Sequence, residues 1–164
     1  MEGKNSSVIL DSLISLFRKD QCRRLIRREI NILPESATIK DVLLSFHEKK
    51  IDYACFVDDN ENLVGLVTER NIVHWVGTSD TVVEAPAKSI MSKDLIVMES
   101  IEPISKLVMT MYNKSFQHIP IVDQGKLVGV ISARDFIHYL IDYFAESVYT
   151  VLPGQPAQQR REGA

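Results

Sequence analysis

Cysteine is scarce in this 164-residue sequence, which contains only Cys22 and Cys55. The two residues lie far apart in the chain and match none of the short Cys and His spacings that bind zinc. Nothing in the sequence supports a disulfide between them, and unpaired thiols are typical of proteins from a reducing compartment. We therefore expect two free cysteines in a cytoplasmic protein.

The sequence also lacks an excess of basic charge, because 19 Lys and Arg residues stand against 22 Asp and Glu residues, for a formal net charge of -3. Charge-driven binding of nucleic acid needs a basic excess, so the overall composition gives no basis for it. No apolar run approaches the roughly 20 residues that a membrane span needs, and polar residues interrupt the apolar N-terminal stretch. We expect no nucleic-acid partner, no membrane insertion and no signal peptide.

Catalytic signatures are absent as well. The sequence contains no Gly-x-Ser-x-Gly elbow, no P-loop and no glycine pattern of a dinucleotide-binding fold. Neither cysteine has a recognisable base partner in the sequence. The histidines His47, His74, His118 and His138 form no His-x-x-x-His motif and no cluster with carboxylates. We therefore expect neither an enzyme nor a metal site.

What the sequence does contain is an internal repeat. The segment "GLVTERNI" (65–72) matches "GVISARDF" (129–136) at an offset of 64 positions. Upstream, "FVDDNENLVG" (56–65) aligns with "IVDQGKLVG" (121–129), and one extra loop residue in the first copy makes the offset 65 before that loop. Two copies of one supersecondary unit explain this self-similarity.

Each copy shows the same order of predicted elements. Apolar residues at helical spacing predict a helix over 40–49 in the first copy and over 105–114 in the second. The predicted strands cover 53–57 and 63–67 in the first copy and 118–122 and 127–131 in the second, with a lead-in strand near 95–98. A closing helix follows each second strand, which gives the order β-α-β-β-α. One such unit leaves an apolar sheet face uncovered, so we expect two units to pack face to face.

These patterns divide the chain into four parts. We expect an N-terminal helical segment over 1–31, a first repeat over 32–84, a second repeat over 85–145, and the end of a C-terminal helix with a disordered tail over 146–164. The N-terminal helix is expected to cover most of 6–31. Six basic residues between positions 18 and 29 are interpreted as its solvated face, with binding to an acidic protein, anionic lipid or nucleic acid as the alternative.

The step from the second strand to the closing helix carries the candidate site. The motif residues are Ser132, Arg134 and Asp135 in the second copy and Thr68, Arg70 and Asn71 in the first. One interpretation is a helix cap, in which the hydroxyl and the residue three positions later bond the free backbone N–H groups. The other is a ligand site, because a helix N-terminus favours anions, a carboxylate can bond a ribose diol, and an arginine can pair with phosphate. The repetition favours a ligand site, since two packed copies would place both motifs around a shared cleft.

The repeated motif resembles a tandem pair of CBS domains, also called a Bateman module. The resemblance rests on "ACFVDDNENLVGLVTERNI" (54–72), "HIPIVDQGKLVGVISARDF" (118–136) and the lead-in "SIMSKDLIVMESIEPISKLVMTM" (89–111), and it covers roughly residues 28–145. It implies an α/β (α+β) fold in which two β-α-β-β-α repeats pack around a pseudo-twofold axis, with flanking N- and C-terminal helices and two candidate clefts.

The resemblance also implies a function. CBS pairs are regulatory modules that bind adenosine-containing ligands such as AMP, ADP, ATP or S-adenosylmethionine, and we expect such a nucleotide as a regulatory ligand with no required cofactor. The family implies a homodimer formed through the helices. It usually tethers the pair to an enzyme, channel or transporter, and none is recognisable here, so we expect signalling to an effector protein in trans. A ligand-free interaction scaffold is the alternative, and a nucleotide-processing enzyme is the less favoured one.

The family's ligand contacts map onto both copies by position. The hydroxyl and acid of the motif meet the ribose and phosphate region, which implies Ser132 with Asp135 and Thr68 with Asn71. Strand residues line the pockets, which implies Gln117, His118 and Pro120 in the second copy and Asp52, Tyr53 and Cys55 in the first. Arg134 and Arg70 are interpreted equally as phosphate contacts or as solvated arginines. Asn71 stands where the family usually has Asp, so we expect the second motif to be the better site.

Overall fold

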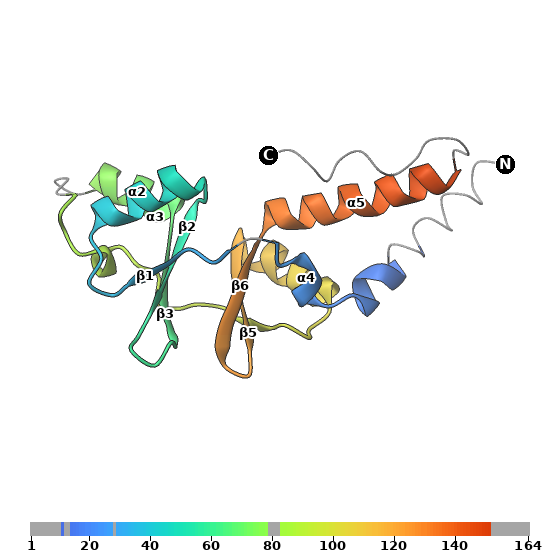
Figure 1. Cartoon of the computed structure of the whole chain (residues 1–164), viewed down its shortest axis with the longest axis horizontal. Coiled ribbons are helices and arrows are strands. Elements are labelled where there is room, and N and C mark those ends of the chain that lie inside the picture. The colour runs from blue at the N-terminus through green and yellow to red at the C-terminus, as the bar shows by residue number, and fades with distance from the viewer. Residues whose placement is uncertain (1–10, 12–13, 28, 79–82, 152–164) are drawn as a thin grey trace.

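The computed structural model describes residues 11, 14–27, 29–78 and 83–151, with side chains described through Ala145. The two repeats lie side by side, each with a small sheet and its own helices, and the last helix extends beyond the second repeat (Figure 1). The disordered tail expected over 152–164 lies outside the described residues, as do residues 6–10 of the expected N-terminal helix.

The first repeat consists of β1 (Ile32–Pro34), α2 (Ile39–Lys49), β2 (Tyr53–Val57), β3 (Leu63–Thr68) and α3 (Glu69–Thr78). β2 lies in the middle of the sheet, parallel to β1 and antiparallel to β3. Helix α2 begins at a capping box between Thr38 and Asp41 and ends where Lys50 adopts the left-handed conformation. These two signals place α2 between β1 and β2 and turn the chain back into the sheet.

The second repeat has the same order, with β4 (Met98–Glu99), α4 (Ile104–Lys114), β5 (His118–Asp123), β6 (Lys126–Ser132) and α5 (Ala133–Val151). Its sheet also has a parallel pair followed by an antiparallel pair. The strand register shifts at the same place in both copies, between Phe56 and Val57 and between Ile121 and Val122. The predicted β-α-β-β-α repeat is therefore confirmed, and the lead-in strand expected near 95–98 is β4.

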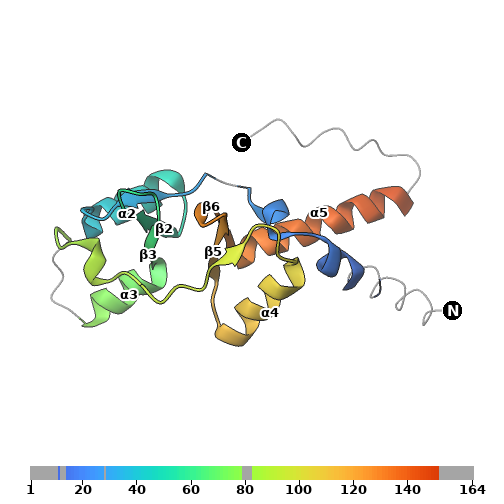
Figure 2. The same ribbon diagram turned by 90° about the horizontal axis from the view of Figure 1, so that it is seen from below.

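The two sheets pack against each other through one face and against their own helices through the other. Along β2, Ala54 and Phe56 point into the core of the first repeat. The alternating residues Tyr53 and Cys55 instead pack with Val130 of β6. This alternation is typical of a strand with two buried faces, and it confirms the face-to-face arrangement that the repeat predicted (Figure 2).

The N-terminal segment departs from the expected continuous helix. Residues 14–19 are helical, Cys22–Leu25 form a short 3-10 helix (η1), and the described residues 26, 27 and 29–31 are not helical. The helix ends because backbone donors of the segment bond the second repeat instead, from Cys22 to the Glu102 carbonyl at 2.8 Å and from Arg23 to the Ser100 carbonyl at 2.9 Å. The segment therefore belongs to the packed body of the second repeat.

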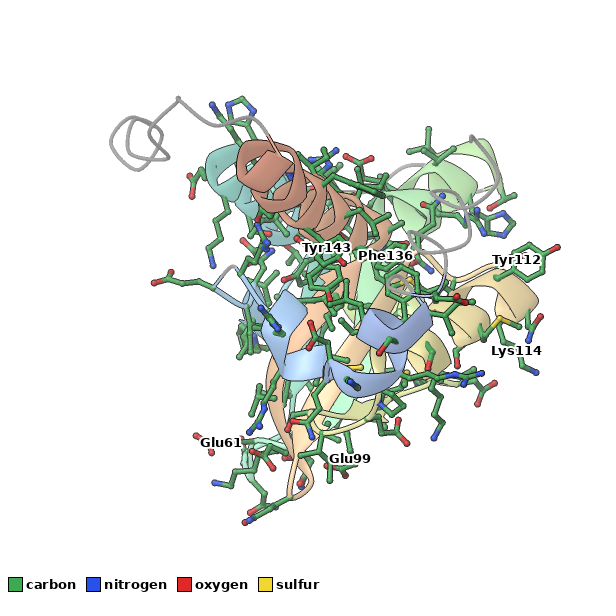
Figure 3. All side chains as sticks on the ribbon, turned by 90° about the vertical axis from the view of Figure 1, so that its right-hand side faces the viewer. Glu61, Glu99, Tyr112, Lys114, Phe136 and Tyr143 are labelled. Carbon is green, nitrogen blue, oxygen red and sulfur yellow. The ribbon has the colours of Figure 1, made fainter. Side chains whose placement is uncertain are left out.

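Side chains of the N-terminal segment complete the core of that repeat. Cys22 and Leu25 are fully buried there. The Phe17 ring lies 5.5 Å from the ring of Phe136, on the side of α5 that faces this segment (Figure 3). The hydroxyl of Tyr139 donates to Asp20 at 2.6 Å, and burial together with this carboxylate raises the pKa of Tyr139. These contacts hold the segment between α4 and α5.

The basic residues of this segment that the structure describes do not form one helical face. Arg24 pairs with Asp20 at 2.8 Å, and Arg27 pairs with Asp142 of α5 at 2.6 Å. Both arginines therefore form ion pairs within the chain. Arg24 lies in η1, whereas Arg27 follows it, so the two do not share one helix. The described residues of the segment 18–29 therefore do not form the expected basic helix face.

Both cysteines are free and buried. Burial raises the pKa of the Cys22 thiol to about 11 and that of the Cys55 thiol to about 12. The thiolate is the reactive form of cysteine, so both side chains act as small apolar groups at neutral pH. Cys22 packs in the core of the second repeat and Cys55 between the two sheets.

Candidate functional site

Both strand-to-helix steps are capped by the residues that the sequence singled out. At the start of α5, the backbone N–H and the hydroxyl of Ser132 donate to Asp135 Oδ2 at 2.8 and 2.5 Å, and the Asp135 N–H donates back to the Ser132 hydroxyl at 3.3 Å. At the start of α3, the N–H and hydroxyl of Thr68 donate to Asn71 Oδ1 at 2.9 and 2.8 Å. The structure therefore shows both helix caps. Whether either cap can also bind a ligand depends on its exposure and on the cavity beside it.

The two caps differ in their surroundings. Asp135 is only 7% exposed, whereas Asn71 is half-buried and its Nδ2 donates to Ser92 Oγ at 3.1 Å. Arg70 and Arg134, each the second residue of its helix, are both exposed. The first cap is therefore bound to the segment that joins the repeats, while the carboxylate of the second cap is closed off from solvent.

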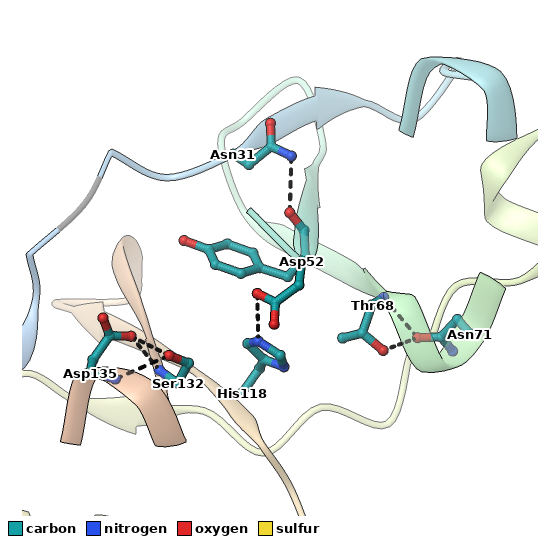
Figure 4. A network of polar contacts seen from close by, with 8 residues as sticks. Asn31, Asp52, Thr68, Asn71, His118, Ser132 and Asp135 are labelled. Carbon is teal, nitrogen blue, oxygen red and sulfur yellow. Dashed lines mark hydrogen bonds and ion pairs between the residues drawn. The ribbon is translucent and has the colours of Figure 1, made fainter. Parts of the chain in front are cut away.

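A polar contact between the repeats lies between the two caps. His118, the first residue of β5, places Nε2 3.1 Å from Oδ1 of Asp52, the residue directly before β2. The imidazole is 7% exposed, and its ring centroid lies 5.5 Å from that of Tyr53. Figure 4 shows this pair in the middle, with the Thr68–Asn71 cap on one side and the Ser132–Asp135 cap on the other.

An open cavity of about 370 Å³ lies beside this pair, between the repeats. We call it the inter-repeat cavity. Its apolar lining consists of Leu66, Leu95, Ile96, Phe116 and Pro120. Its polar and ionisable lining consists of Asp52, Thr68, Glu69, Arg70, Asn71, Ser92, Lys93, Asp94, Ser115, Gln117 and His118. The cavity thus combines an apolar surface with the exposed end of helix α3.

The inter-repeat cavity brings together residues that the sequence had assigned to different copies. Seven predicted ligand residues line it, namely Asp52, Thr68, Arg70, Asn71, Gln117, His118 and Pro120. The other predicted residues, Ser132, Arg134, Asp135, Tyr53 and Cys55, do not belong to its lining. Since the sheets pack face to face, the strand start of the second repeat lies opposite the helix start of the first. From the sequence we expected Gln117, His118 and Pro120 to share a site with the second motif, which we expected to be the better site. In the structure these three residues share the cavity with the first motif instead.

A family model described as the CBS domain matches residues 22–78 and 87–142. The chain belongs to the CBS-domain family. The two matched regions contain the two sheets, and the second ends within α5. No catalytic family is indicated by these matches.

Relatives of this CBS pair include a 17.7 kDa uncharacterized protein of Acidianus ambivalens, which is 27% identical over 132 residues, or 80% of this chain and 76% of that protein. The protein MJ1225 of Methanocaldococcus jannaschii is 29% identical over 119 residues, 72% of this chain, and the match spans 42% of that protein. The chain therefore covers most of one relative and less than half of the other.

Solved structures of CBS proteins share the fold. An uncharacterized conserved protein from Pyrococcus horikoshii matches with a TM-score of 0.70 and 19% identity, over 90% of this chain and 98% of that one. The CBS domain protein PAE2072 from Pyrobaculum aerophilum, complexed with AMP, matches with a TM-score of 0.67 and 26% identity, over 77% of this chain and 99% of that one. The architecture described above is therefore that of a CBS pair.

Sequence reasoning missed one part of the cavity of this CBS pair, the segment 92–96. The backbone N–H and carbonyl of Ser92 bond the carbonyl and N–H of Leu66 at 2.9 and 3.0 Å. This short antiparallel bridge carries Lys93, Asp94, Leu95 and Ile96 to the helix start. The only signal in the sequence is that this segment runs into the lead-in strand predicted near 95–98.

The cavity lining gives no indication of a resident metal. Among the described residues, no three His, Cys, Asp or Glu side chains gather in a group that could hold a metal ion. None of the helices in the described part of the chain combines the length and apolarity that a bilayer span requires. The chemistry of the cavity is therefore considered from its own side chains and backbone groups.

Proposed function

We propose that this CBS pair is a regulatory sensor that binds an adenosine-containing nucleotide in the inter-repeat cavity and signals to an effector protein. The observation that carries the proposal is the composition of the cavity, in which seven predicted ligand residues line a space that includes the N-terminus of α3. The AMP complex of the 26% identical protein from Pyrobaculum aerophilum supports it.

Each part of such a ligand finds a suitable partner in the lining. The apolar residues Leu66, Ile96 and Pro120 offer surface for a purine base, which buries mainly apolar area. The hydroxyl oxygen of Thr68 and the amide of Asn71 can bond ribose hydroxyls. The Arg70 guanidinium and the positive end of helix α3 favour a phosphate group. A nucleotide bound here would touch both repeats, so its binding can favour one arrangement of the repeats over another.

The second motif remains part of the proposal as a separate, less accessible site. Ser132, Arg134 and Asp135 repeat the chemistry of the first motif, and the ring centroid of Tyr53 lies 5.5 Å from that of His118. The Asp135 carboxylate already accepts two hydrogen bonds from Ser132 and is almost fully buried. The Asn71 amide oxygen accepts the same two bonds from Thr68, so the caps alone do not distinguish the motifs. Because Asp135 is buried and no residue of the second motif lines the inter-repeat cavity, we place the first nucleotide in that cavity.

The binding test is calorimetric titration of AMP into the full chain and two matched variants. Arg70→Ala should weaken AMP binding by about ten- to a hundredfold, because a charge-assisted contact to phosphate is lost. Arg134→Ala removes the same side chain from the equivalent place in the second copy and should have little effect. Asn71→Ala should likewise weaken AMP binding more than Asp135→Ala, the reverse of the order that the sequence favoured.

Other outcomes of this titration would contradict the proposal. Loss of binding only in Arg134→Ala would place the nucleotide at the second motif. No binding of AMP, ADP, ATP, NAD or S-adenosylmethionine would favour a ligand-free scaffold. Formation of ADP or AMP from ATP and magnesium would indicate an enzyme instead of a sensor.

We also propose that the protein forms a homodimer through its helices. Exposed apolar side chains occur at helical spacing on α3, at Val73 (71% exposed) and Val76 (54%), and on α5, at Ile137 and Ile141 (both 55%). A second copy would remove these side chains from water. Light scattering on the full chain should give twice the 18.6 kDa chain mass, and Val73→Asp should give the single mass. A wild-type monomer at high concentration would refute the dimer.

A further inference from the structure

We infer that the inter-repeat cavity selects an adenosine ligand with a single phosphate, AMP or a close analogue, against ATP. The inference rests on the proposed function, because it specifies the ligand class of the same cavity. It comes from the arrangement of charged side chains around the helix start and from the size of the cavity.

Two cations lie at the N-terminus of α3. Arg70 is the second residue of the helix. Lys93 follows Ser92, which the backbone bridge to Leu66 and the hydrogen bond from Asn71 hold against the same helix start. Both side chains line the cavity, and the ion pairs found among the described residues include neither of them. Two unpaired cations and a helix N-terminus suit one phosphate group.

Acidic side chains flank both cations. Glu69 directly precedes Arg70 and Asp94 directly follows Lys93, and both acids line the cavity. Asp52 adds a third carboxylate, which His118 contacts. The lining therefore holds three carboxylates against two permanent cations, so a chain of phosphates extending from the helix start would approach like charge. Like charges placed opposite each other at a binding site discriminate against the wrong ligand.

The dimensions of the cavity agree with this charge pattern. Pockets for small ligands span about 300–1,000 Å³, and the inter-repeat cavity, at about 370 Å³, lies near the lower limit. A base, a ribose and one phosphate are therefore enough to occupy a cavity of this size, and the two further phosphates of a triphosphate would add negative charge to a lining that already holds Glu69 and Asp94.

The test is titration of AMP, ADP and ATP into the full chain at constant ionic strength, with and without magnesium. Affinity should fall from AMP to ADP to ATP, by about tenfold or more overall. If ATP binds as tightly as AMP, the selectivity is refuted while the proposed function stands. If ATP binds more tightly only with magnesium, the carboxylates act as metal ligands, and the inference is again wrong. If none of the three binds while NAD or S-adenosylmethionine does, the selectivity for AMP is refuted, and if none of these five ligands binds, the proposed function itself fails.

A double variant distinguishes the local effect of the cavity's acidic side chains on nucleotide affinity from the effect of the protein's net charge. Glu69→Gln with Asp94→Asn should raise the affinity for ATP relative to AMP by about fivefold, because exposed charge contacts are individually modest. Glu48→Gln with Asp123→Asn changes the net charge equally at two exposed acids outside the cavity. This control should leave the ratio of ATP to AMP affinity unchanged. Equal effects of the two pairs would show that only the overall charge matters and would overturn the assignment to Glu69 and Asp94.

Discussion

Replacing Leu107 by alanine should lower the free energy of unfolding by about 3–4 kcal/mol. Leu107 lies on α4, is fully buried, and packs in the core cluster that the second repeat shares with the N-terminal segment. Truncating a leucine at such a position removes its transfer free energy and leaves a cavity, because the packed neighbours relax only in part. Urea denaturation followed by circular dichroism measures the change.

The matched control lies on the same helix. Met109 is 55% exposed, so Met109→Ala should change the free energy of unfolding by less than about 0.5 kcal/mol. Similar losses for the two variants would show that α4 does not pack as described.

The same experiment also tests whether the two repeats unfold together. The single tryptophan, Trp75, lies on α3 in the first repeat, while Leu107 lies in the second. The cluster of Tyr53, Cys55 and Val130 joins the two sheets. In the Leu107→Ala variant, we therefore expect the fluorescence of Trp75 and the circular dichroism to show a single unfolding transition with the same midpoint urea concentration.

The repeat made most of the fold predictable from the sequence. Two short runs of alternating apolar residues followed by a helical pattern predict a β-hairpin and a helix that packs on it. The same pattern recurs 64 or 65 positions later, which predicts the second repeat. Burial of both faces of β2, with Cys55 on one face and Phe56 on the other, follows because each sheet packs against its own helices on one side and against the other sheet on the other side. The two family matches confirm this organisation.

The composition of the cavity was less predictable because it depends on contacts between distant segments. The grouping of Thr68 with His118 follows from how the two sheets meet, and the entry of Lys93 and Asp94 follows from the bridge between Ser92 and Leu66. Neither contact leaves a periodic signal in the sequence. A position-by-position comparison of the two copies treats them as independent units, so it pairs each strand with its own motif.

The N-terminal segment shows the same limit of local reasoning. Its apolar residues at helical spacing predicted one long helix. The backbone N–H groups of Cys22 and Arg23 instead bond carbonyls of the second repeat, close to 80 residues further along the chain. Such tertiary hydrogen bonds outweigh a helical propensity that differs between residues by less than about 1 kcal/mol.

Asn31→Ala should lower the free energy of unfolding by about 2–3 kcal/mol, because it leaves buried polar groups without partners. Asn31 precedes β1 and is fully buried. Its amide nitrogen donates to Ser45 Oγ and to the Tyr53 carbonyl, both at 2.9 Å, and its Oδ1 accepts from Lys49 Nζ at 2.9 Å. Three bonds from one side chain thus connect the residue before β1 to α2 and to the start of β2. Figure 4 shows one of them, the bond to the backbone carbonyl next to Asp52, which lines the cavity.

Two further variants separate the hydrogen bonds of Asn31 from its volume. Asn31→Leu keeps a side chain of similar size but none of its polar atoms, and it should be as unstable as Asn31→Ala if the network is what matters. Asn113→Ala, on the exposed side of α4, removes the same amide from a position in water and should change stability little. Urea denaturation of the three variants decides the question. If Asn31→Leu is as stable as the wild-type protein, the volume of the side chain is sufficient for stability. The start of β2 would then keep its position beside the cavity without the hydrogen bond from Asn31 to the Tyr53 carbonyl.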